Sequence, residues 1–232
     1  MTNYIEDLNR DGYAIIPNII TPGELEEARE YFFSWKNKLT EIIPNFLENN
    51  NKLNAHNIFK FHEVGHQRFM WFLRTRPKIQ DVFKRIWNTE ELTVGFDGCC
   101  WMPSDLNKKD NIWTHTDQAP AFSGMKCIQG FVSLTSNKER TLRVYKGSHK
   151  LHQEYFTTRN IDHKTNWELI DHDYLDQIKN TKINLNVPAG SLVLWDSRTF
   201  HQNQYGRPGE ERIVCYISYL PKNDTGNDRE QQ

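Results

Sequence analysis

Two histidines and one aspartate carry the strongest chemical signal in the sequence. His115 and Asp117 stand two residues apart, so in an extended strand their side chains point to the same side. A third donor, His201, directly follows a strong apolar strand much further along the chain. Two neutral imidazoles and one carboxylate on one face suit Fe(II) and leave the opposite coordination positions open. These three residues are therefore predicted to hold a catalytic metal ion.

Arg212 is the second feature with chemical content. It opens the apolar strand Ile213–Tyr219, so its guanidinium can point into a barrel while the neighbouring side chains pack. A buried guanidinium needs an anion, and a carboxylate bound through both oxygens matches its planar fork. The anion is either an acidic co-substrate or an Asp or Glu on a neighbouring strand, and the sequence leaves both open.

A competing metal motif is present at His62-Glu-Val-Gly-His66. On an α-helix both histidines would share one face, with Glu63 as general base, as in zinc metalloproteases, and Glu90 or Glu91 could supply a third ligand. Against this, Gly65 weakens a helix by about 1 kcal/mol relative to alanine. A zinc protease is therefore the principal alternative to an iron oxygenase.

Several short motifs occur in a specific order along nearly the whole chain. They are Asp11-Gly-Tyr-Ala-Ile-Ile-Pro17, His115-Thr-Asp117, Gly147-Ser-His-Lys150, Pro188-Ala-Gly-Ser-Leu-Val-Leu-Trp-Asp-Ser-Arg-Thr-Phe-His201 and Arg212. Together they resemble the successive signatures of the phytanoyl-CoA dioxygenase family of Fe(II)/2-oxoglutarate-dependent oxygenases. This chain departs from the family at residues 137–141, where glycines are usual, and that departure affects only a turn.

The resemblance assigns a role to each matching position. His115, Asp117 and His201 correspond to the iron ligands, and Arg212 to the clamp on the distal carboxylate of 2-oxoglutarate. Asn203 matches a position at which the family often places a small polar residue beside that carboxylate. Separately, Gln129 shares a strand face with Phe131, so it is either a polar contact inside the barrel or a structural hydrogen-bonding residue.

The reaction that the resemblance implies uses Fe(II), O2 and 2-oxoglutarate, and it decarboxylates 2-oxoglutarate to succinate. We expect hydroxylation of a small or medium organic substrate. The carboxylate of Asp117 favours hydroxylation over halogenation, because related halogenases lose this group to make room for halide. A further alternative is a catalytically inactive jelly-roll binding protein, but such a protein has no physical reason to keep the metal donors and Arg212.

The substrate pocket is expected to lie around the metal and to be lined by Trp71, Arg74, Asp97, Trp101 and Trp113. The alternative for the tryptophans is core packing, and Arg74 could instead be a solvated residue on a helix. Nothing in the sequence identifies the substrate, because relatives with different substrates share these motifs.

The elements that position these residues follow from the spacing of apolar side chains. Residues 1–90 are predicted to be mainly helical, with one helix beginning at Thr21-Pro22 and two more separated near Pro77. Short apolar strands recur through residues 91–220. Helices first and strands afterwards predict a mainly β protein with flanking helices, a barrel with an N-terminal helical buttress. The resemblance implies that this barrel is a double-stranded β-helix, the cupin-like jelly roll.

Three segments fall outside this pattern. Residues 45–57 are polar and predicted to form an exposed connection. Residues 151–180 interrupt the strands and are interpreted either as a partly helical lid over the barrel mouth or as a solvated insertion. Residues 223–232 are predicted to be a flexible tail. At 232 residues the whole chain is expected to form a single domain.

The composition excludes several classes of partner. The 29 Lys and Arg residues almost balance the 30 Asp and Glu residues, so no global field recruits nucleic acid or an anionic membrane. No leader-like N-terminus or long apolar run is present, and a cytoplasmic protein that binds a small molecule is expected. The four cysteines lie in strand-like apolar runs and are predicted to be reduced core residues. The oligomeric state is not readable from the sequence.

Overall fold

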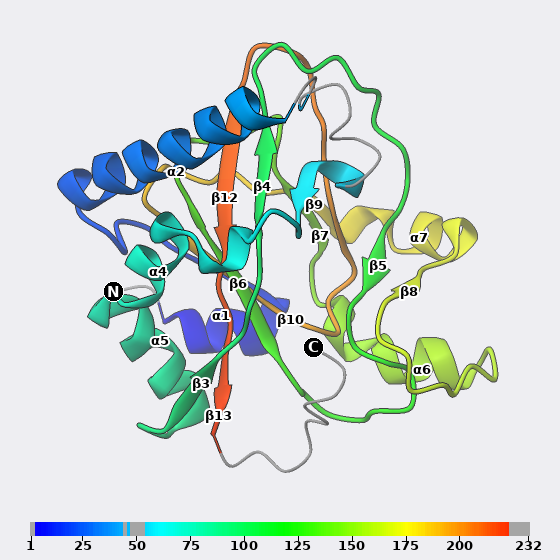
Figure 1. Ribbon diagram of the computed structural model, residues 1–232. Coiled ribbons are helices and arrows are strands. Elements are labelled where there is room, and N and C mark those ends of the chain that lie inside the picture. Colours follow the sequence, from blue (N-terminus) through cyan, green and yellow to red (C-terminus); the bar gives the residue numbers. More distant parts are fainter. Residues whose placement is uncertain (1–2, 44–45, 47–53, 223–232) are drawn as a thin grey trace.

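Two antiparallel β-sheets make up the centre of the protein (Figure 1). The computed structural model describes residues 3–43, 46 and 54–222. The larger sheet has six strands in the order β1-β10-β6-β12-β4-β2, and the smaller has five in the order β8-β5-β11-β7-β9. Side chains from both sheets share one apolar layer, so the sheets pack face to face. Together with its flanking helices, this arrangement is the jelly-roll fold that the sequence predicted.

The strands are short, as is usual for this fold. The larger sheet contains β1 (Tyr13–Ile16), β2 (Ile58–Phe59), β4 (Cys99–Met102), β6 (Ile128–Ser133), β10 (Leu192–Asp196) and β12 (Arg212–Tyr216). The smaller sheet contains β5 (His115–Thr116), β7 (Leu142–Tyr145), β8 (Glu168–Leu169), β9 (Lys182–Asn184) and β11 (His201–Asn203). A separate pair joins β3 (Leu92–Val94) to β13 (Tyr219–Pro221).

Helices α1 (Tyr4–Asp11), α2 (Pro22–Ile42), α4 (Arg68–Arg74) and α5 (Pro77–Trp87) precede most of the strands. Thr21 and Glu24 form a capping box at the start of α2, since each side chain bonds the backbone N–H of the other. Pro77 begins α5 and separates it from α4, as the sequence predicted. Helix α1 was not predicted from the spacing of apolar residues.

The helices cover the outer face of the larger sheet. In Figure 1, α2, α4 and α5 lie together on one side of the strands, and α6 and α7 lie on the other. Phe32 of α2 and Phe69 of α4 pack edge to face, with ring centroids 5.4 Å apart, and both belong to the same apolar cluster as Trp101 of β4. This cluster fixes the six-stranded sheet against the N-terminal half of the chain.

Residues 151–180 form part of the smaller sheet and its outer cover. Helices α6 (His152–Thr157) and α7 (His172–Gln177) contribute to an apolar cluster with Tyr145 and Phe200, which project from the outer face. Strand β8 pairs with β5, with Leu169 opposite His115. The segment is partly helical, as predicted, but its central residues belong to the sheet edge. That this segment covers the barrel mouth as a lid stays a prediction.

Short 3-10 turns complete the described elements: η1 (Ala55–Asn57), η2 (Val64–His66), η3 (Ser148–Lys150) and η4 (Lys179–Thr181). Asn54 and Asn57 are 1% and 4% exposed, so the predicted exposed connection is wrong for this part of residues 45–57. Residues 47–53 and the predicted tail at 223–232 lie outside the described residues. The four cysteines are free thiols, as predicted. Within the described ranges, no helix combines the length and apolar character needed to cross a membrane.

Candidate metal centre and co-substrate site

The two histidines predicted to bind metal are cross-strand neighbours in the smaller sheet. Strand β5 pairs with β11 so that His115 lies directly opposite His201. Their ring centroids are 4.4 Å apart, and each residue is 5% exposed. Antiparallel pairing places opposed side chains on the same face of a sheet. The pairing therefore brings together two imidazoles that are far apart in the sequence.

Backbone carbonyls fix the orientation of both imidazoles. Nδ1 of His115 lies 3.1 Å from the carbonyl oxygen of Trp113, and Nδ1 of His201 lies 2.8 Å from that of Thr199. When Nδ1–H donates to a carbonyl, the neutral ring presents the Nε2 lone pair to a metal. Burial, followed by the nearby His201, lowers the pKa of His115 to about 4. Both the orientation of the rings and the neutral form of His115 thus suit metal binding.

Asp117 is the third candidate donor. Its carboxylate oxygens lie 3.5 Å from Nε2 of His115 and 3.3 Å from Nε2 of His201. Gln129 on β6 donates from Nε2 to Oδ2 of Asp117 at 2.8 Å. Burial alone would raise the pKa of Asp117, but the adjacent histidines and Gln129 outweigh it and hold the pKa well below its usual range. The carboxylate is therefore ionised, as a metal ligand must be.

The three donor atoms fit one divalent metal ion. They lie within 4.8 Å of one another, and in the described part of the chain no other group of three or more His, Cys, Asp or Glu side chains meets that test. Two imidazoles and one carboxylate form the donor set of non-haem Fe(II) oxygenases, in which the opposite positions stay open.

The HExxH segment does not have the conformation that a zinc protease needs. His62 and Glu63 have positive φ angles of 59° and 53°, and residues 64–66 form a 3-10 turn, so the two histidines share no α-helical face. The ring of His62 packs against Phe46, and that of His66 against Phe96. The zinc alternative therefore has no structural support.

Arg212, the first residue of β12, is completely buried. Its Nη1 donates to Sγ of Cys100 at 3.2 Å, and its guanidinium lies 5.4 Å from the centroid of the Phe131 ring. Its Nε and Nη2 have no hydrogen-bond partner among the described residues. The acidic side chain on a neighbouring strand, which the sequence left open as its partner, is not found in the described part of the chain.

Two other buried arginines show what a structural role looks like. Arg74 donates from Nη1 to the carbonyl oxygen of Gly65 at 2.5 Å and from Nη2 to that of Asp97 at 3.0 Å. Arg140 likewise bonds two backbone carbonyls through its two terminal nitrogens. Nε of Arg74 and Arg140 also has no partner in the described residues, but among these three only Arg212 leaves both Nε and Nη2, one whole edge of its planar fork, free for a ligand. That edge matches a carboxylate.

Polar atoms without partners also lie on neighbouring strands. Asn203 stands two residues beyond His201 on β11, so it shares the face of the metal donor. Its Nδ2 donates to the hydroxyl of Tyr216 at 3.2 Å, which connects β11 to β12. Its Oδ1 and the Oε1 of Gln129 have no partner in the described residues. These atoms are available to a bound ligand or to water.

The residues predicted to line a substrate pocket divide into several groups. Trp113 stacks on His115 at a centroid distance of 5.0 Å, and His56 stacks on its other side at 3.7 Å, so Trp113 supports the metal donor. Trp101 is wrong as a pocket residue. Along β4, Cys100 and Met102 face the layer between the sheets, whereas Trp101 packs into the cluster beneath the helices.

Trp71, Arg74 and Asp97 lie close together. Trp71 is 39% exposed and packs on Phe96, and the Arg74 guanidinium lies 5.4 Å from the Trp71 ring centroid. Arg74 is 1% exposed, so the alternative of a solvated arginine is wrong. It holds the backbone at Asp97, whose side chain is half-buried and accepts a hydrogen bond from Ser218.

Trp167 is a residue near the metal donors that the sequence did not single out. Its ring centroid lies 5.5 Å from that of His115, and the residue is 47% exposed. It immediately precedes β8, which pairs with β5. A tryptophan in the polar segment 151–180 was a weak signal, but the pairing of that segment with the metal-binding strand could not be predicted from local pattern.

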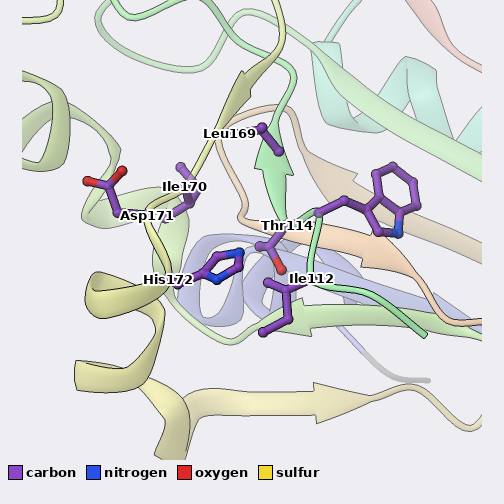
Figure 2. Close-up of a pocket in the computed structure, with 7 residues that line it drawn as sticks. Ile112, Thr114, Leu169, Ile170, Asp171 and His172 are labelled. Carbon is purple, nitrogen blue, oxygen red and sulfur yellow. The ribbon is translucent and has the colours of Figure 1, made fainter. Parts of the chain in front are cut away.

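A pocket of about 220 Å³ lies on the other side of the metal-binding strand. Figure 2 shows Ile112, Thr114 and His172 converging there, with Asp171 pointing away. Along the strand, the side chain of Thr114 alternates with those of Trp113 and His115, and its hydroxyl donates to Gln202. Trp113 also lines this pocket, but the metal donors and Arg212 do not, so it is not the space between them.

Comparisons with known proteins agree with this geometry. A family model described as phytanoyl-CoA dioxygenase matches residues 8–204. A curated relative, "Ava biosynthesis cluster protein O" of Aspergillus versicolor, is 29% identical over 248 aligned positions, covering 94% of this chain and 77% of that protein.

Solved structures with a similar fold include non-haem enzymes. The apo form of the non-haem monooxygenase ThoJ aligns with a TM-score of 0.67 at 16% identity, covering 95% of this chain and 78% of that one. EctD from S. alaskensis, solved with 2-oxoglutarate and 5-hydroxyectoine, aligns with a TM-score of 0.64 at 16% identity, covering 95% and 76%. At these identities the likeness shows the fold alone. The family match over residues 8–204 shows that the chain belongs to the phytanoyl-CoA dioxygenase family of non-haem Fe(II), 2-oxoglutarate-dependent oxygenases.

Proposed function

We propose that this enzyme hydroxylates a small or medium organic substrate and converts 2-oxoglutarate to succinate. One observation carries the proposal. The same two-sheet structure holds the three candidate metal donors and a buried arginine, Arg212, whose Nε and Nη2 have no partner among the described residues. The name of the Aspergillus relative refers to a biosynthesis cluster, which supports a biosynthetic intermediate as the substrate. The phytanoyl-CoA of the family name is not implied, because related folds and sites serve many substrates.

The three donors divide the task of holding iron. His115 and His201 would present their Nε2 atoms to iron, because the Nδ1 atom of each lies at a backbone carbonyl. Asp117 brings one negative charge, and Gln129 fixes the carboxylate by donating to Oδ2. His115, Asp117 and His201 would together hold the ion and leave coordination positions open for 2-oxoglutarate and O2.

The partly free guanidinium of Arg212 would hold the distal carboxylate of 2-oxoglutarate through Nε and Nη2. Asn203 would add one polar contact beside that carboxylate. Bound iron and 2-oxoglutarate would supply the oxidising power, because 2-oxoglutarate loses CO2 as O2 is reduced, with one oxygen atom passing to the substrate and the other to succinate. The chain's own part is to orient both organic molecules and to keep water away from the reacting carbon.

The proposal is tested by measuring iron binding and succinate formation with wild type and with His115→Ala, Asp117→Ala and His201→Ala. Removing a residue that only hydrogen-bonds a metal ligand costs about 10- to 100-fold in metal affinity. Removing one of the ligands themselves should therefore cost more than about 100-fold. Succinate formation should fall to background. His172→Ala, at an exposed histidine of α7, is the matched control. Unchanged turnover of 2-oxoglutarate in the three donor variants would refute the proposal.

A further inference from the structure

A row of polar side chains leads away from the metal donors across the larger sheet. Gln129 of β6 bonds Asp117 at one end of the row. Directly after β12 the backbone N–H of Ile217 donates to the carbonyl oxygen of Gly130, and this register places Ser218 beside Gln129. Ser218 then donates from Oγ to Oδ2 of Asp97 at 2.8 Å.

These side chains are partly accessible. Gln129, Ser218 and Asp97 are each half-buried, and the Asp117 side chain is 27% exposed. By contrast, Ile128, Gly130 and Ile217, their neighbours along the chain, are buried. The polar row is therefore the part of this region that a ligand beside Asp117 could contact.

The carboxylate of Asp97 forms no ion pair within the described residues. Burial raises the pKa of Asp97, and the negative charge of Asp117 adds to that effect, while Ser218, Arg74 and Lys60 act in the opposite direction. Arg74 donates to the backbone oxygen of Asp97 and not to its carboxylate. Within the described residues, Oδ1 of Asp97 accepts no hydrogen bond.

The local backbone is built to place this carboxylate. A Cβ atom at Gly95 would come within 2.5 Å of Oγ of Ser218 and 3.4 Å of Oδ2 of Asp97. Only glycine leaves the room that lets the Asp97 carboxylate reach Ser218. Gly95 and Arg74 together thus position Asp97 at the end of the polar row.

Trp167 gives the metal site an apolar wall. Its φ angle is +73°, a conformation that a bulky residue adopts at a cost of order 1–3 kcal/mol when its surroundings enforce it. The surroundings here are β8, which begins at the next residue, and Asn166, whose Oδ1 accepts the backbone N–H of Ala119 at 3.0 Å. This strained backbone holds a half-exposed indole beside His115.

We infer that Asp97, with Gln129 and Ser218, forms the recognition surface for a hydrogen-bond donor of the primary substrate, and that Trp167 contacts its apolar skeleton. The substrate class is therefore an apolar, preferably cyclic molecule that carries an amine or hydroxyl group. The inference rests on the proposed function, because it places this molecule beside the iron donors. Asp97 is a binding residue in this arrangement and takes no part in holding the metal.

The test uses three probes on one skeleton: 2-phenylethylamine, 2-phenylethanol and the donor-free methyl ether of that alcohol. Calorimetry measures their binding to the full chain loaded with Mn(II) and 2-oxoglutarate, so that no turnover occurs. The amine and the alcohol should bind wild type at least about tenfold more tightly than the ether. A factor of this size is the effect of one hydrogen bond to a charged group.

Asp97→Leu should abolish this preference, and Asp97→Asn should retain part of it for the alcohol and lose it for the amine. Trp167→Ala should weaken all three probes and keep their ratio. Asp173→Asn, at an exposed aspartate of α7, should behave like wild type. Mn(II) and 2-oxoglutarate affinities, measured on the same samples, establish that each variant is folded.

The two levels of failure are distinguishable. If wild type binds neither Mn(II) nor 2-oxoglutarate, the proposed function fails. If it binds both, but shows no donor preference or keeps that preference in Asp97→Leu, only the present inference is overturned. Absence of measurable binding of all probes to the loaded wild type counts as absence of preference.

Discussion

Replacing Arg212 with lysine tests the co-substrate assignment most directly. Arg212 has two unpartnered N–H groups on one edge, Nε and Nη2, which can hold both oxygens of a carboxylate. A hydrogen bond to a charged group contributes about 1.5–3 kcal/mol net. Lysine keeps the charge but cannot form the planar fork, so one of the two bonds is lost. The affinity for 2-oxoglutarate should fall roughly 10- to 150-fold.

Calorimetric titration of the Mn(II)-loaded protein with 2-oxoglutarate measures this change. The affinity for Mn(II) itself should stay the same, because Arg212 is not among the three metal donors. Arg207→Lys is a matched control, since that side chain is 84% exposed and paired with Glu139 at the surface. Wild-type affinity for 2-oxoglutarate in Arg212→Lys, or a parallel loss of Mn(II) binding, would refute the reasoning.

Three further predictions concern single residues around the site. Gln129→Leu removes the hydrogen bond to Asp117 and should weaken Mn(II) binding roughly 10- to 100-fold in a metal titration. Unchanged Mn(II) affinity would show that this hydrogen bond does not orient the Asp117 carboxylate for metal binding. In the metal-free protein, the pKa of His115 is lowered to about 4 by burial, so the unfolded chain takes up the proton first as pH falls. Roughly 3 kcal/mol of stability should therefore be lost between about pH 6.5 and pH 4, and urea unfolding should show that His115→Phe lacks this dependence. Trp101→Ala should reduce stability by about 3–5 kcal/mol and leave Mn(II) affinity unchanged; a loss of Mn(II) affinity in the folded variant would contradict its placement in the core.

The three candidate metal donors, which the structure brings together, could be selected from the sequence because residue type and local spacing carried most of the information. His115 and Asp117 are two residues apart, and His201 follows an unmistakable apolar strand. What the sequence could not show is that His115 lies opposite His201, because register between distant strands depends on the packing of the whole sheet. The same limit concealed β8, whose pairing with β5 brings Trp167 beside His115.

The wrong pocket residue illustrates a second limit. Strand β4 reads Cys-Cys-Trp-Met, which is apolar throughout, and all four residues are buried. In a strand buried on both faces, alternation of polar and apolar side chains is absent, so the sequence does not show which face a residue occupies. Trp101 could be assigned to the helical side only once the register of β4 with β12 was known.

The arginines show why partners, more than burial, distinguish a binding residue from a structural one. Arg74, Arg140 and Arg212 are all buried, yet only the first two satisfy both terminal nitrogens with backbone carbonyls. A buried donor that lacks its partner costs about 1–3 kcal/mol, and Arg212 has two such nitrogens among the described residues. Arg74 and Arg140 each leave only Nε without a partner in the described ranges, whereas Arg212 leaves Nε and Nη2 on the same edge, and a bound carboxylate would offset the cost of both. The free edge of Arg212 therefore favours a ligand over the protein carboxylate that the sequence left open as its partner.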